Sequence, residues 1–480
     1  MRKNILIVAS ESDGLAKTGG LADVVAALPR YLAELGYDAR IIMPYHSCIK
    51  QRYDGTTRQL YRGSLRLGWR EQYLGLELLQ QRGVKIYLVD NNYYFGHSIY
   101  EGGEKEIEQY AFFSCAVEQL LDKLSLDGDD FFPQVLHLND WHSALLPLLL
   151  LQRGGKSRPR CLLTIHNLAY QGRCSLALAQ DLLSQYLTAD ALPYLEHYGA
   201  ANFLKAGCAL ADAVNTVSPS YANEILTEQL GEGLDGVLLR RKEQGLLYGI
   251  LNGLDCRLYD PAWDEHLPVN YSVNDIAGKK LCKLALQREL GLTEDEGRPL
   301  LAMVSRLSSQ KAPELVLHMA SELVHSRAQL VVLGSGERWV ELALGELYDY
   351  YHGSLFVRIG YDDALARRIY AGSDMVLMPS RFEPCGLTQL IAMRYGSLPI
   401  VHETGGLRDT VQAYDCNSGT GTGFSFAPHS KQAFAAVVRQ AVDVYRHNQP
   451  HWQNMLRAAM SAPVDFAVTA GQYAKLYEQL

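Results

Sequence analysis

Hydrophobic positions follow two alternating patterns along the chain. Short runs rich in β-branched residues and leucine are separated by stretches in which apolar residues recur with helical spacing. This alternation is typical of parallel β-sheets with helices on both faces, and it predicts an α/β protein. The runs place strands at residues 5–9, 39–43, 84–89, 135–138, 161–165, 213–217 and 247–250 of the first half, and at 300–304, 329–333, 355–359, 375–378 and 398–401 of the second.

The segment from 252 to 271 breaks both patterns. It contains Pro261, Trp263, Pro268 and several aspartates without a sustained period. Because a chain of 480 residues is too long for one core, we place a domain joint here. Ligands of doubly wound domains bind beyond the carboxyl ends of the strands, so we expect two sheets that face one another across a cleft.

Composition argues against several classes of partner and location. The 45 basic and 53 acidic side chains give a net charge of −8 without long runs of one sign, which argues against nucleic acid or an anionic membrane as the main partner. The apolar runs at residues 5–9 and 144–151 are too short for a signal-peptide core or a membrane span. The nine cysteines stand singly, which favours a reducing, cytoplasmic location over a disulfide framework or a structural zinc site.

The loop after the first strand has the composition of a phosphate-binding turn. Residues 17–24 read Lys-Thr-Gly-Gly-Leu-Ala-Asp-Val and precede a helix expected over 21–35. Glycines such as Gly20 let the backbone approach an anion, the start of a helix offers free N–H groups, and Lys17 adds a positive charge. A glycine turn of purely structural purpose is the alternative.

Further polar groups follow two other strands of the first half. Residues 139–142 read Asn-Asp-Trp-His after the strand at 135–138, and His166 and Asn167 follow the strand at 161–165. Functional side chains of a parallel-sheet enzyme are exposed at such strand ends. The pattern therefore predicts that these groups line the cleft.

Structural roles stay open for the same residues. Asn139 or Asp140 can cap a following helix, His142 can lie at the surface, and His166 can be a core histidine. A zinc site made from His137 and His142 has no third ligand at a recognisable spacing.

Two cations stand at the end of a strand in the second half. Arg306 and Lys311 follow the buried run at 300–304. Arginine binds phosphate through two parallel hydrogen bonds and lysine adds charge, so the pair predicts a site for a departing diphosphate. A solvated surface pair is the alternative.

A carboxylate and a helix start share the segment at 378–389. Glu383 precedes a helix expected to begin near Leu387. The carboxylate can hold sugar hydroxyls, while the N–H groups of Gly386 and Leu387 and the Thr388 hydroxyl can hold phosphate. We expect Glu383 to bind and orient rather than to attack as a nucleophile.

Other segments give weaker signals. Residues 334–336 read Gly-Ser-Gly and lack the third glycine of a dinucleotide fingerprint, so an NAD site is not supported. The acidic run at 127–130 is interpreted as a solvated loop rather than a metal site, and the glycine turn at 404–407 is explained about as well by structure as by binding. Tyr361 can stack on a nucleotide base or simply pack.

Five segments of the chain resemble the signatures of bacterial glycogen synthases and plant starch synthases, in their order and nearly in their wording. They are residues 17–24, 139–142, 166–167, 306–311 and 381–389. The resemblance spans close to the full chain. It implies the GT-B fold, in which two Rossmann-like doubly wound domains face one another across a deep cleft. The implied domains are 1–255 on the acceptor side and 256–462 on the nucleotide-sugar side, with a C-terminal helix within 463–480 that returns to the first domain.

The resemblance also implies an activity. Glucose would pass from ADP-glucose to the non-reducing end of an α-1,4-glucan such as glycogen, with retention at the anomeric carbon and without a metal or cofactor. The implied catalytic residues are Asp140, His166, Arg306, Lys311 and Glu383. The implied substrate-binding residues are Lys17, Gly20, Asn167, Tyr361, Cys385, Gly386, Leu387 and Thr388. Lys17 would bind donor phosphate, Arg306 and Lys311 the leaving diphosphate, and Tyr361 the adenine.

The chain departs from the family pattern at several positions. Residues 10–14 lack the usual proline, Gln109 stands where arginine is common, Ala312 and Pro313 replace a glycine after Lys311, and the C-terminal stretch lacks the usual tryptophan. These departures concern acceptor affinity and domain closure more than the reaction, because no phosphate-reading residue is lost.

Three rival functions share parts of this pattern. A UDP-sugar-dependent GT-B transferase would keep the fold, and a glucan-binding homologue would have lost catalysis. An α-glucan phosphorylase would need a lysine that carries pyridoxal phosphate. The wording of the loop at 17–24 and the intact charged residues favour the ADP-glucose enzyme.

Overall fold

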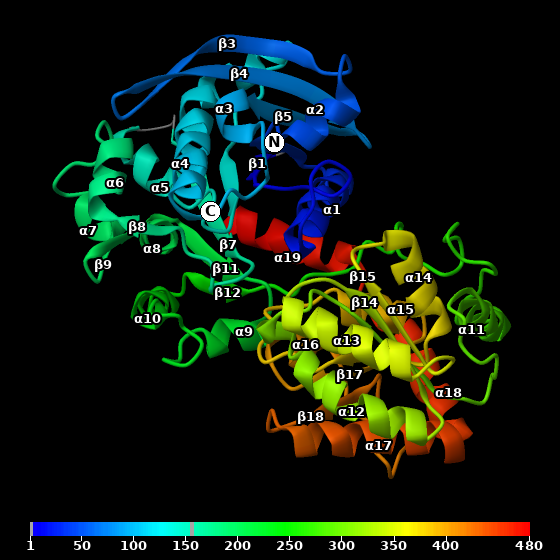
Figure 1. The fold of residues 1–480 in the computed structure, drawn as a ribbon. Coiled ribbons are helices and arrows are strands. Elements are labelled where there is room, and N and C mark those ends of the chain that lie inside the picture. Colours follow the sequence, from blue (N-terminus) through cyan, green and yellow to red (C-terminus); the bar gives the residue numbers. More distant parts are fainter. Residues whose placement is uncertain (1–2, 154–157) are drawn as a thin grey trace. The chain divides into compact units, whose positions relative to one another are not determined.

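A largely parallel sheet forms the centre of each of the two units into which the chain divides (Figure 1). The computed structural model describes residues 3–153 and 158–480. Unit 1 comprises the described residues up to Asn252 together with Phe466–Leu480, and unit 2 comprises Gly253–Asp465. The α/β class expected from the sequence is confirmed.

The main sheet of unit 1 has nine strands in the order β12-β11-β7-β6-β1-β2-β5-β4-β3. The strands from β12 to β5 pair in parallel, and β4 and β3 add an antiparallel hairpin at one edge. These strands are β1 (Asn4–Val8), β2 (Asp38–Pro44), β3 (Arg58–Leu67), β4 (Arg70–Gln81), β5 (Val84–Asp90), β6 (Val135–Asn139), β7 (Arg160–Ile165), β11 (Ala213–Thr216) and β12 (Leu247–Gly249). A separate antiparallel sheet consists of β8 (Arg173–Ser175), β9 (Glu196–His197) and β10 (Ala200–Asn202).

The sheet of unit 2 is parallel throughout and has six strands in the order β15-β14-β13-β16-β17-β18. They are β13 (Leu300–Val304), β14 (Gln329–Gly334), β15 (Leu355–Ile359), β16 (Met375–Met378), β17 (Leu398–His402) and β18 (Phe424–Phe426). In each sheet the connections switch direction at a central strand, since β1 lies between β2 and β6, and β13 lies between β14 and β16. Such switch points are where doubly wound sheets bind their ligands.

Helices connect the strands in both units. Unit 1 contains α1 (Gly20–Glu34), α2 (Ser47–Tyr53), α3 (Asn92–Phe95), α4 (Gly103–Leu120), α5 (Leu146–Leu149), α6 (Leu176–Leu182), α7 (Leu192–Leu195), α8 (Phe203–Leu210), α9 (Pro219–Glu224), α10 (Asp235–Glu243), α19 (Phe466–Gln479) and the 3-10 turns η1 (Leu121–Asp127) and η2 (Leu150–Gln152). Unit 2 contains α11 (Ala277–Glu289), η4 (Ser309–Lys311), α12 (Pro313–His325), α13 (Arg338–Tyr350), α14 (Asp363–Gly372), α15 (Thr388–Arg394), α16 (Gly405–Thr410), α17 (Lys431–His447) and α18 (Gln449–Met460).

Alternate residues of the strands explain why helices cover both faces of the unit 1 sheet. Leu6 and Val8 of β1 belong to one apolar cluster with residues of α4. Ile5 and Ile7 belong to another with residues of α1 and α19. Successive side chains of a strand point to opposite faces, so a strand buried on both faces is apolar at nearly every position.

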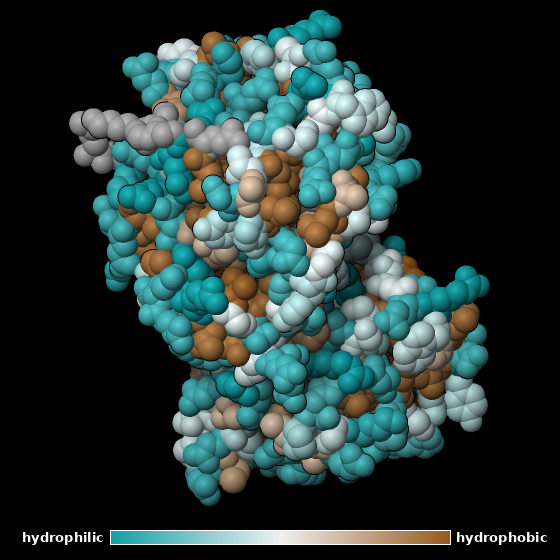
Figure 2. Space-filling model, turned by 90° about the vertical axis from the view of Figure 1, so that its left-hand side faces the viewer, coloured by the Kyte–Doolittle hydropathy of each residue, from teal (hydrophilic) through white to brown (hydrophobic). Residues whose placement is uncertain are grey.

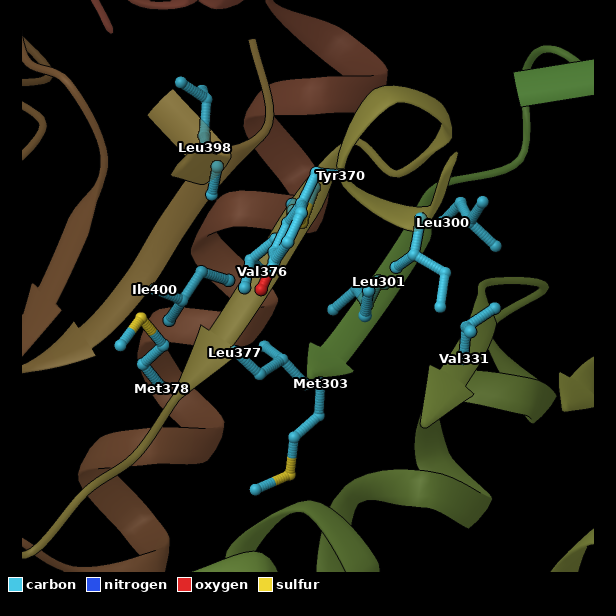
Figure 3. Close-up of a cluster of buried hydrophobic side chains, with 14 of the residues drawn as sticks. Leu300, Leu301, Met303, Val331, Tyr370, Val376, Leu377, Met378, Leu398 and Ile400 are labelled. Carbon is cyan, nitrogen blue, oxygen red and sulfur yellow. The ribbon is translucent and has the colours of Figure 1, made fainter. Parts of the chain in front are cut away.

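Unit 2 has one continuous apolar core around its sheet. Figure 3 shows part of it, with Leu301 of β13, Val376 of β16 and Ile400 of β17 close to Tyr370 of α14. All four side chains are buried. The core therefore holds the strand ends that carry the polar segments of this unit.

Every strand expected from the sequence is present, with ends shifted by at most one residue. Three features were not predicted from the sequence: the edge hairpin of β3 and β4, the small antiparallel sheet and β18. In the hairpin, Leu65, Leu67, Leu74 and Leu76 are buried while polar neighbours face outward. A half-exposed strand alternates apolar and polar residues and gives a weaker signal than a run buried on both faces.

The acidic run at 127–130 is not merely solvated, and that interpretation is wrong for Asp129. Its carboxylate accepts two hydrogen bonds from the Arg40 guanidinium, at 3.2 and 2.5 Å, and one from Lys85 Nζ at 2.7 Å. Arg40 is only 5% exposed and lies over the Phe131 ring. Asp129 therefore anchors a buried arginine.

The C-terminal helix α19 packs on unit 1 beside α1 (Figure 1). The Tyr477 hydroxyl lies 2.7 Å from His137 Nδ1, and the Tyr473 hydroxyl accepts a hydrogen bond of 3.0 Å from the Asn215 amide. The other ring nitrogen of His137 lies 2.8 Å from Thr164 Oγ1. Buried polar side chains of the sheet thus form hydrogen bonds with the last helix, as buried polar groups in folded proteins usually do.

Among the described residues, no helix is both long enough and apolar enough to cross a bilayer. On the face drawn in Figure 2, hydrophobic residues form separate patches with hydrophilic residues between them. All nine cysteines are free thiols.

We predict that Tyr477→Phe lowers the free energy of unfolding by about 1–3 kcal/mol, because it leaves a fully buried ring nitrogen of His137 without its partner. Val468→Ala on the same helix is the control, since Val468 is 53% exposed. Urea denaturation of both variants provides the measurement. Equal midpoints for the two variants would contradict the prediction.

Candidate active site

In unit 1, a buried carboxylate organises the loop between β1 and α1. Glu11, 3% exposed, accepts hydrogen bonds from the backbone N–H of Thr18, from the Thr18 hydroxyl at 3.0 Å and from the N–H of Gly19 at 3.3 Å. The N–H groups of Thr18 and Gly19, which precede the helix, are therefore bound within the protein. Gly20, the first residue of α1, is exposed and has no side chain to obstruct a ligand.

Lys17 is held by carboxylates of its own loop and helix. Its Nζ lies 2.7 Å from Asp23 Oδ1 and 3.2 Å from Asp13 Oδ1. A quarter of its side chain is exposed. Lys17 can therefore reach a ligand only by sharing or exchanging these contacts.

Asp140, His166 and Asn167 come together at the adjacent ends of β6 and β7. Asp140 Oδ1 accepts hydrogen bonds from the backbone N–H of His166 at 2.7 Å and from that of Asn167 at 3.3 Å. His166 Nε2 lies 2.9 Å from Asn139 Oδ1, so this nitrogen carries the proton and donates. The Asn167 side chain accepts from the N–H of Ala169 at 3.1 Å, which shapes the loop itself.

The electrostatics of this cluster follow from burial. Burial raises the pKa of Asp140 from 3.8 to about 7, the two backbone N–H donors lower it, and the Glu11 carboxylate raises it. Burial likewise lowers the pKa of His166, so its imidazole is neutral near pH 7. Asp140 also has a left-handed backbone with φ of +55°, which aspartate tolerates better than most residues.

Aromatic residues pack against His142, close to Asp140 in the sequence, and most of these contacts were not predicted from the sequence. His142 is 6% exposed and packs against the rings of Trp141 and Tyr110 at 4.3 and 4.4 Å, so a surface location is wrong. Tyr100 donates a hydrogen bond to Glu11 Oε1 at 3.2 Å. Nothing in the local sequence at Glu11 or Tyr100 indicates this pairing, because 89 residues separate them.

In the parts of the chain that the structure describes, no group of three or more His, Cys, Asp or Glu side chains is placed to hold a metal ion. His137, one of the two zinc candidates, is occupied by Tyr477 and Thr164.

In unit 2, the loops after β13 and β16 bring an ion pair together. Lys311 Nζ donates to Glu383 Oε2, which also accepts from the Ser380 hydroxyl at 3.0 Å. Glu383 is 6% exposed. The alternative interpretation of Arg306 and Lys311 as a solvated surface pair is therefore wrong for Lys311, because Lys311 neutralises a buried carboxylate.

Arg306 differs from Lys311. Its side chain is exposed and forms no hydrogen bond or ion pair with any residue of the described ranges. It lies immediately beyond β13, at the switch point of the sheet. An exposed guanidinium at such a place is available for an anionic ligand.

The segment after Glu383 forms a tight turn before α15. Gly386 has φ of +78°, and a Cβ there would lie 2.4 Å from Gln389 Oε1. Gln389 donates to the carbonyl groups of Cys385 at 3.0 Å and Gly386 at 2.9 Å, while Leu387 is the N-cap and Thr388 the first helical residue. The turn leaves the start of α15 at the carboxyl end of β16.

The glycine turn at 404–407 supports this segment structurally. Gly405 has φ of +44°, and a Cβ on Gly406 would lie 2.3 Å from the Cys385 carbonyl oxygen. The close approach requires glycine, so packing against the Cys385 backbone explains the turn. Cys385 itself is 5% exposed.

Tyr361 lies in the loop between β15 and α14. It is 76% exposed, precedes α14, and its hydroxyl donates to Asp363 Oδ1 at 3.2 Å. A ring this exposed can be reached by a ligand.

Two departures from the family pattern have structural counterparts. Ala312 is fully buried and has φ of +49°, which is a left-handed conformation. Glycine adopts this conformation without cost, which explains why the family pattern has glycine here. Gln109 donates to the Tyr94 carbonyl at 2.9 Å.

Two family models match the chain. The model described as the starch synthase catalytic domain matches residues 4–240, and the model described as glycosyl transferases group 1 matches residues 289–453. The chain is 42% identical to a glycogen synthase of Clostridioides difficile over 99% of both sequences. It is 40% identical to one of Geobacillus stearothermophilus over 99% of this chain and 97% of the relative. The chain belongs to the glycogen synthase family.

A solved member of the related starch synthases has the same fold. The catalytic domain of starch synthase IV from Arabidopsis thaliana, bound to ADP and acarbose, is 30% identical with a TM-score of 0.89 over 100% of this chain and 99% of that one. The expected family, the GT-B fold and the assignment as a glycosyltransferase are thereby confirmed. The roles of the individual residues remain predictions.

We predict that Asp140→Asn changes how stability depends on pH. Because the pKa of Asp140 is raised from 3.8 to about 7, the folded state binds the proton more tightly, and this group loses stabilising effect as the pH rises from about 4 to 7. Asparagine keeps the oxygen acceptor and cannot ionise. The difference in unfolding free energy between variant and wild type should shift in favour of the variant by a few kcal/mol across this range, at about 1.4 kcal/mol per pKa unit.

Denaturant titrations at pH 4.5, 6 and 7.5 measure this difference. Asp235→Asn is a control, since Asp235 lies in the first turn of α10 and is only partly buried. A difference that does not vary with pH would show that Asp140 is not protonated on folding.

Proposed function

We propose that the protein elongates glycogen by retaining transfer of glucose from ADP-glucose to the non-reducing end of an α-1,4-glucan. The proposal rests mainly on full-length similarity to glycogen synthases combined with polar groups at both sheet switch points. ADP and acarbose in the related starch synthase IV represent the nucleotide and glucan chemistry of such a site. A cytoplasmic location agrees with nine free thiols.

Unit 2 supplies the donor side in this proposal. Arg306 binds the departing diphosphate, and Lys311 shares its ammonium between that group and Glu383. Glu383, Cys385, Gly386, Leu387 and Thr388 hold glucose and phosphate. Tyr361 stacks on adenine.

Unit 1 supplies the acceptor side. Asp140, His166 and Asn167 face the glucose, while Lys17 and Gly20 contact the donor phosphate. The neutral imidazole of His166 adds no positive charge beside the oxocarbenium-like transition state. Asp140 holds the backbone of His166 and Asn167 in place through two hydrogen bonds. The bond between the anomeric carbon and the phosphate oxygen breaks, the acceptor hydroxyl attacks the same face, and its proton passes to the departing diphosphate.

The rivals make different predictions for the donor. Sucrose-phosphate synthase from Thermosynechococcus elongatus shares only the fold, at 19% identity and a TM-score of 0.62. This likeness therefore does not support the hypothesis of a UDP-sugar enzyme, and an assay must test the donor.

We expect the purified protein to release ADP from ADP-glucose in the presence of glycogen, at least tenfold faster than UDP from UDP-glucose. Coupled detection of the nucleoside diphosphate and iodine staining of the glucan provide the measurements. Faster UDP release would replace the donor in the proposal. Absence of turnover with both donors, with glucan binding retained, would favour the non-catalytic homologue.

Arg306→Ala should lower kcat/KM for ADP-glucose by about 10²- to 10³-fold with little effect on stability, because no described residue depends on this side chain. Arg439→Ala is the matched control, since Arg439 is an exposed arginine in α17 that pairs with Glu322. Thermal unfolding accompanies the kinetics. Near wild-type activity of the Arg306 variant would remove this residue from the mechanism.

A further inference from the structure

Lys279, in the first turn of α11, has a buried ammonium group surrounded by oxygen acceptors. It is 7% exposed. Its Nζ donates to the carbonyl groups of Ala371 and Ser373 at 3.0 Å, of Tyr395 at 2.9 Å and, at 3.4 Å, of Tyr370, and to the Ser397 hydroxyl at 3.0 Å. None of the described carboxylates pairs with it, whereas the nearby Lys283 pairs with Asp374 at 2.7 Å.

The carbonyl groups around Lys279 belong to the ends of two helices. Those of Tyr370, Ala371 and Ser373 lie at the carboxyl end of α14, and that of Tyr395 is at the carboxyl end of α15. The last carbonyl groups of a helix lack intrahelical partners and carry partial negative charge. One cation therefore satisfies both helix ends at once.

The opposite ends of these helices adjoin the proposed donor residues. α14 is preceded by Tyr361 and capped by the Asp362 side chain, and it is ten residues long. α15 follows the turn from Glu383 to Leu387 and is seven residues long. A rise of about 1.5 Å per residue makes these helices only about 15 and 10 Å long, so a shift at one end is transmitted to the other.

We propose that Lys279 is a positioning residue for donor binding, which sets the places of α14 and α15 relative to each other. The Ser397 hydroxyl donates to the Tyr370 and Ser373 carbonyl groups, at 2.6 and 2.5 Å, so its own oxygen is left to accept from Lys279. Every hydrogen-bond neighbour of Lys279 Nζ is thus an acceptor, and a side chain without N–H donors at this place cannot replace it. The proposal rests on the proposed function, because it identifies the Tyr361 and Glu383 segments as donor contacts.

The test compares Lys279→Met with Lys280→Met. Lys280 is the adjacent residue, and its exposed ammonium pairs with Glu296. We expect Lys279→Met to raise the KM for ADP-glucose about ten- to hundredfold while the KM for glycogen stays within twofold, since small misplacements of binding groups cost such factors. Lys280→Met should leave both constants unchanged.

A second readout does not depend on the activity. Amide hydrogen exchange should accelerate in residues 360–366 and 383–390 of Lys279→Met, and not in α12 or in Lys280→Met. Unchanged exchange in both segments, or equal acceleration throughout unit 2, would overturn the proposal. If the wild type fails to use ADP-glucose, the proposed function falls and the exchange result still decides the positioning role.

Tyr271→Phe keeps the test decisive if Lys279→Met does not fold. The Tyr271 hydroxyl donates to the same Tyr395 carbonyl at 2.7 Å, and the variant retains the ammonium. We expect a two- to fivefold rise in the KM for ADP-glucose and faster exchange in 383–390 alone. A folded Tyr271→Phe variant with wild-type KM and exchange would count against control of α15 from its carboxyl end.

Discussion

The point at which the strand connections change side, at a central strand, governs where a ligand can bind in both units. Because β1 and β13 have neighbours reached by connections that run to opposite sides, the loops at their carboxyl ends part and leave room for a ligand. Nearly all the candidate residues stand in these loops or in the loops of the next strands. The apolar strands beneath are buried on both faces, so the loops rest on the best-packed part of each unit.

The charges at these loops are more fully compensated than a count of basic residues indicates. Lys17 is bound to two aspartates, Lys311 neutralises Glu383, and Glu11 takes the first N–H groups of its loop. Arg306 of unit 2 differs from these residues. It is exposed, it follows the strand at the switch point, and its side chain has no partner among the described residues. Under the proposed function, anion binding would therefore start at the Arg306 guanidinium and require the exchange of existing ion pairs at Lys17 and Lys311.

The strands were predictable because burial on both faces leaves continuous apolar runs, as at Leu300–Val304. The edge hairpin was not, because one of its faces is exposed. The candidate residues could be predicted from their positions after strands and from the family's sequence motifs. Their hydrogen-bond and ion-pair partners could not be predicted in this way. Lys311 and Glu383 are 72 residues apart, and the adjacency of β13 and β16 alone brings them together. Glu11 was overlooked because an isolated glutamate after a strand carries no distinguishing spacing.

Ala312 makes the Lys311 turn a point of stored strain. Its left-handed backbone costs roughly 1–2 kcal/mol relative to glycine, and the following Pro313 favours an extended conformation at the same residue. Packing around the start of α12 must therefore hold the turn in place. If that packing loosened, the Ala312 backbone could leave its left-handed conformation, and this change would move Lys311 relative to Glu383 while the strands beneath stayed in place.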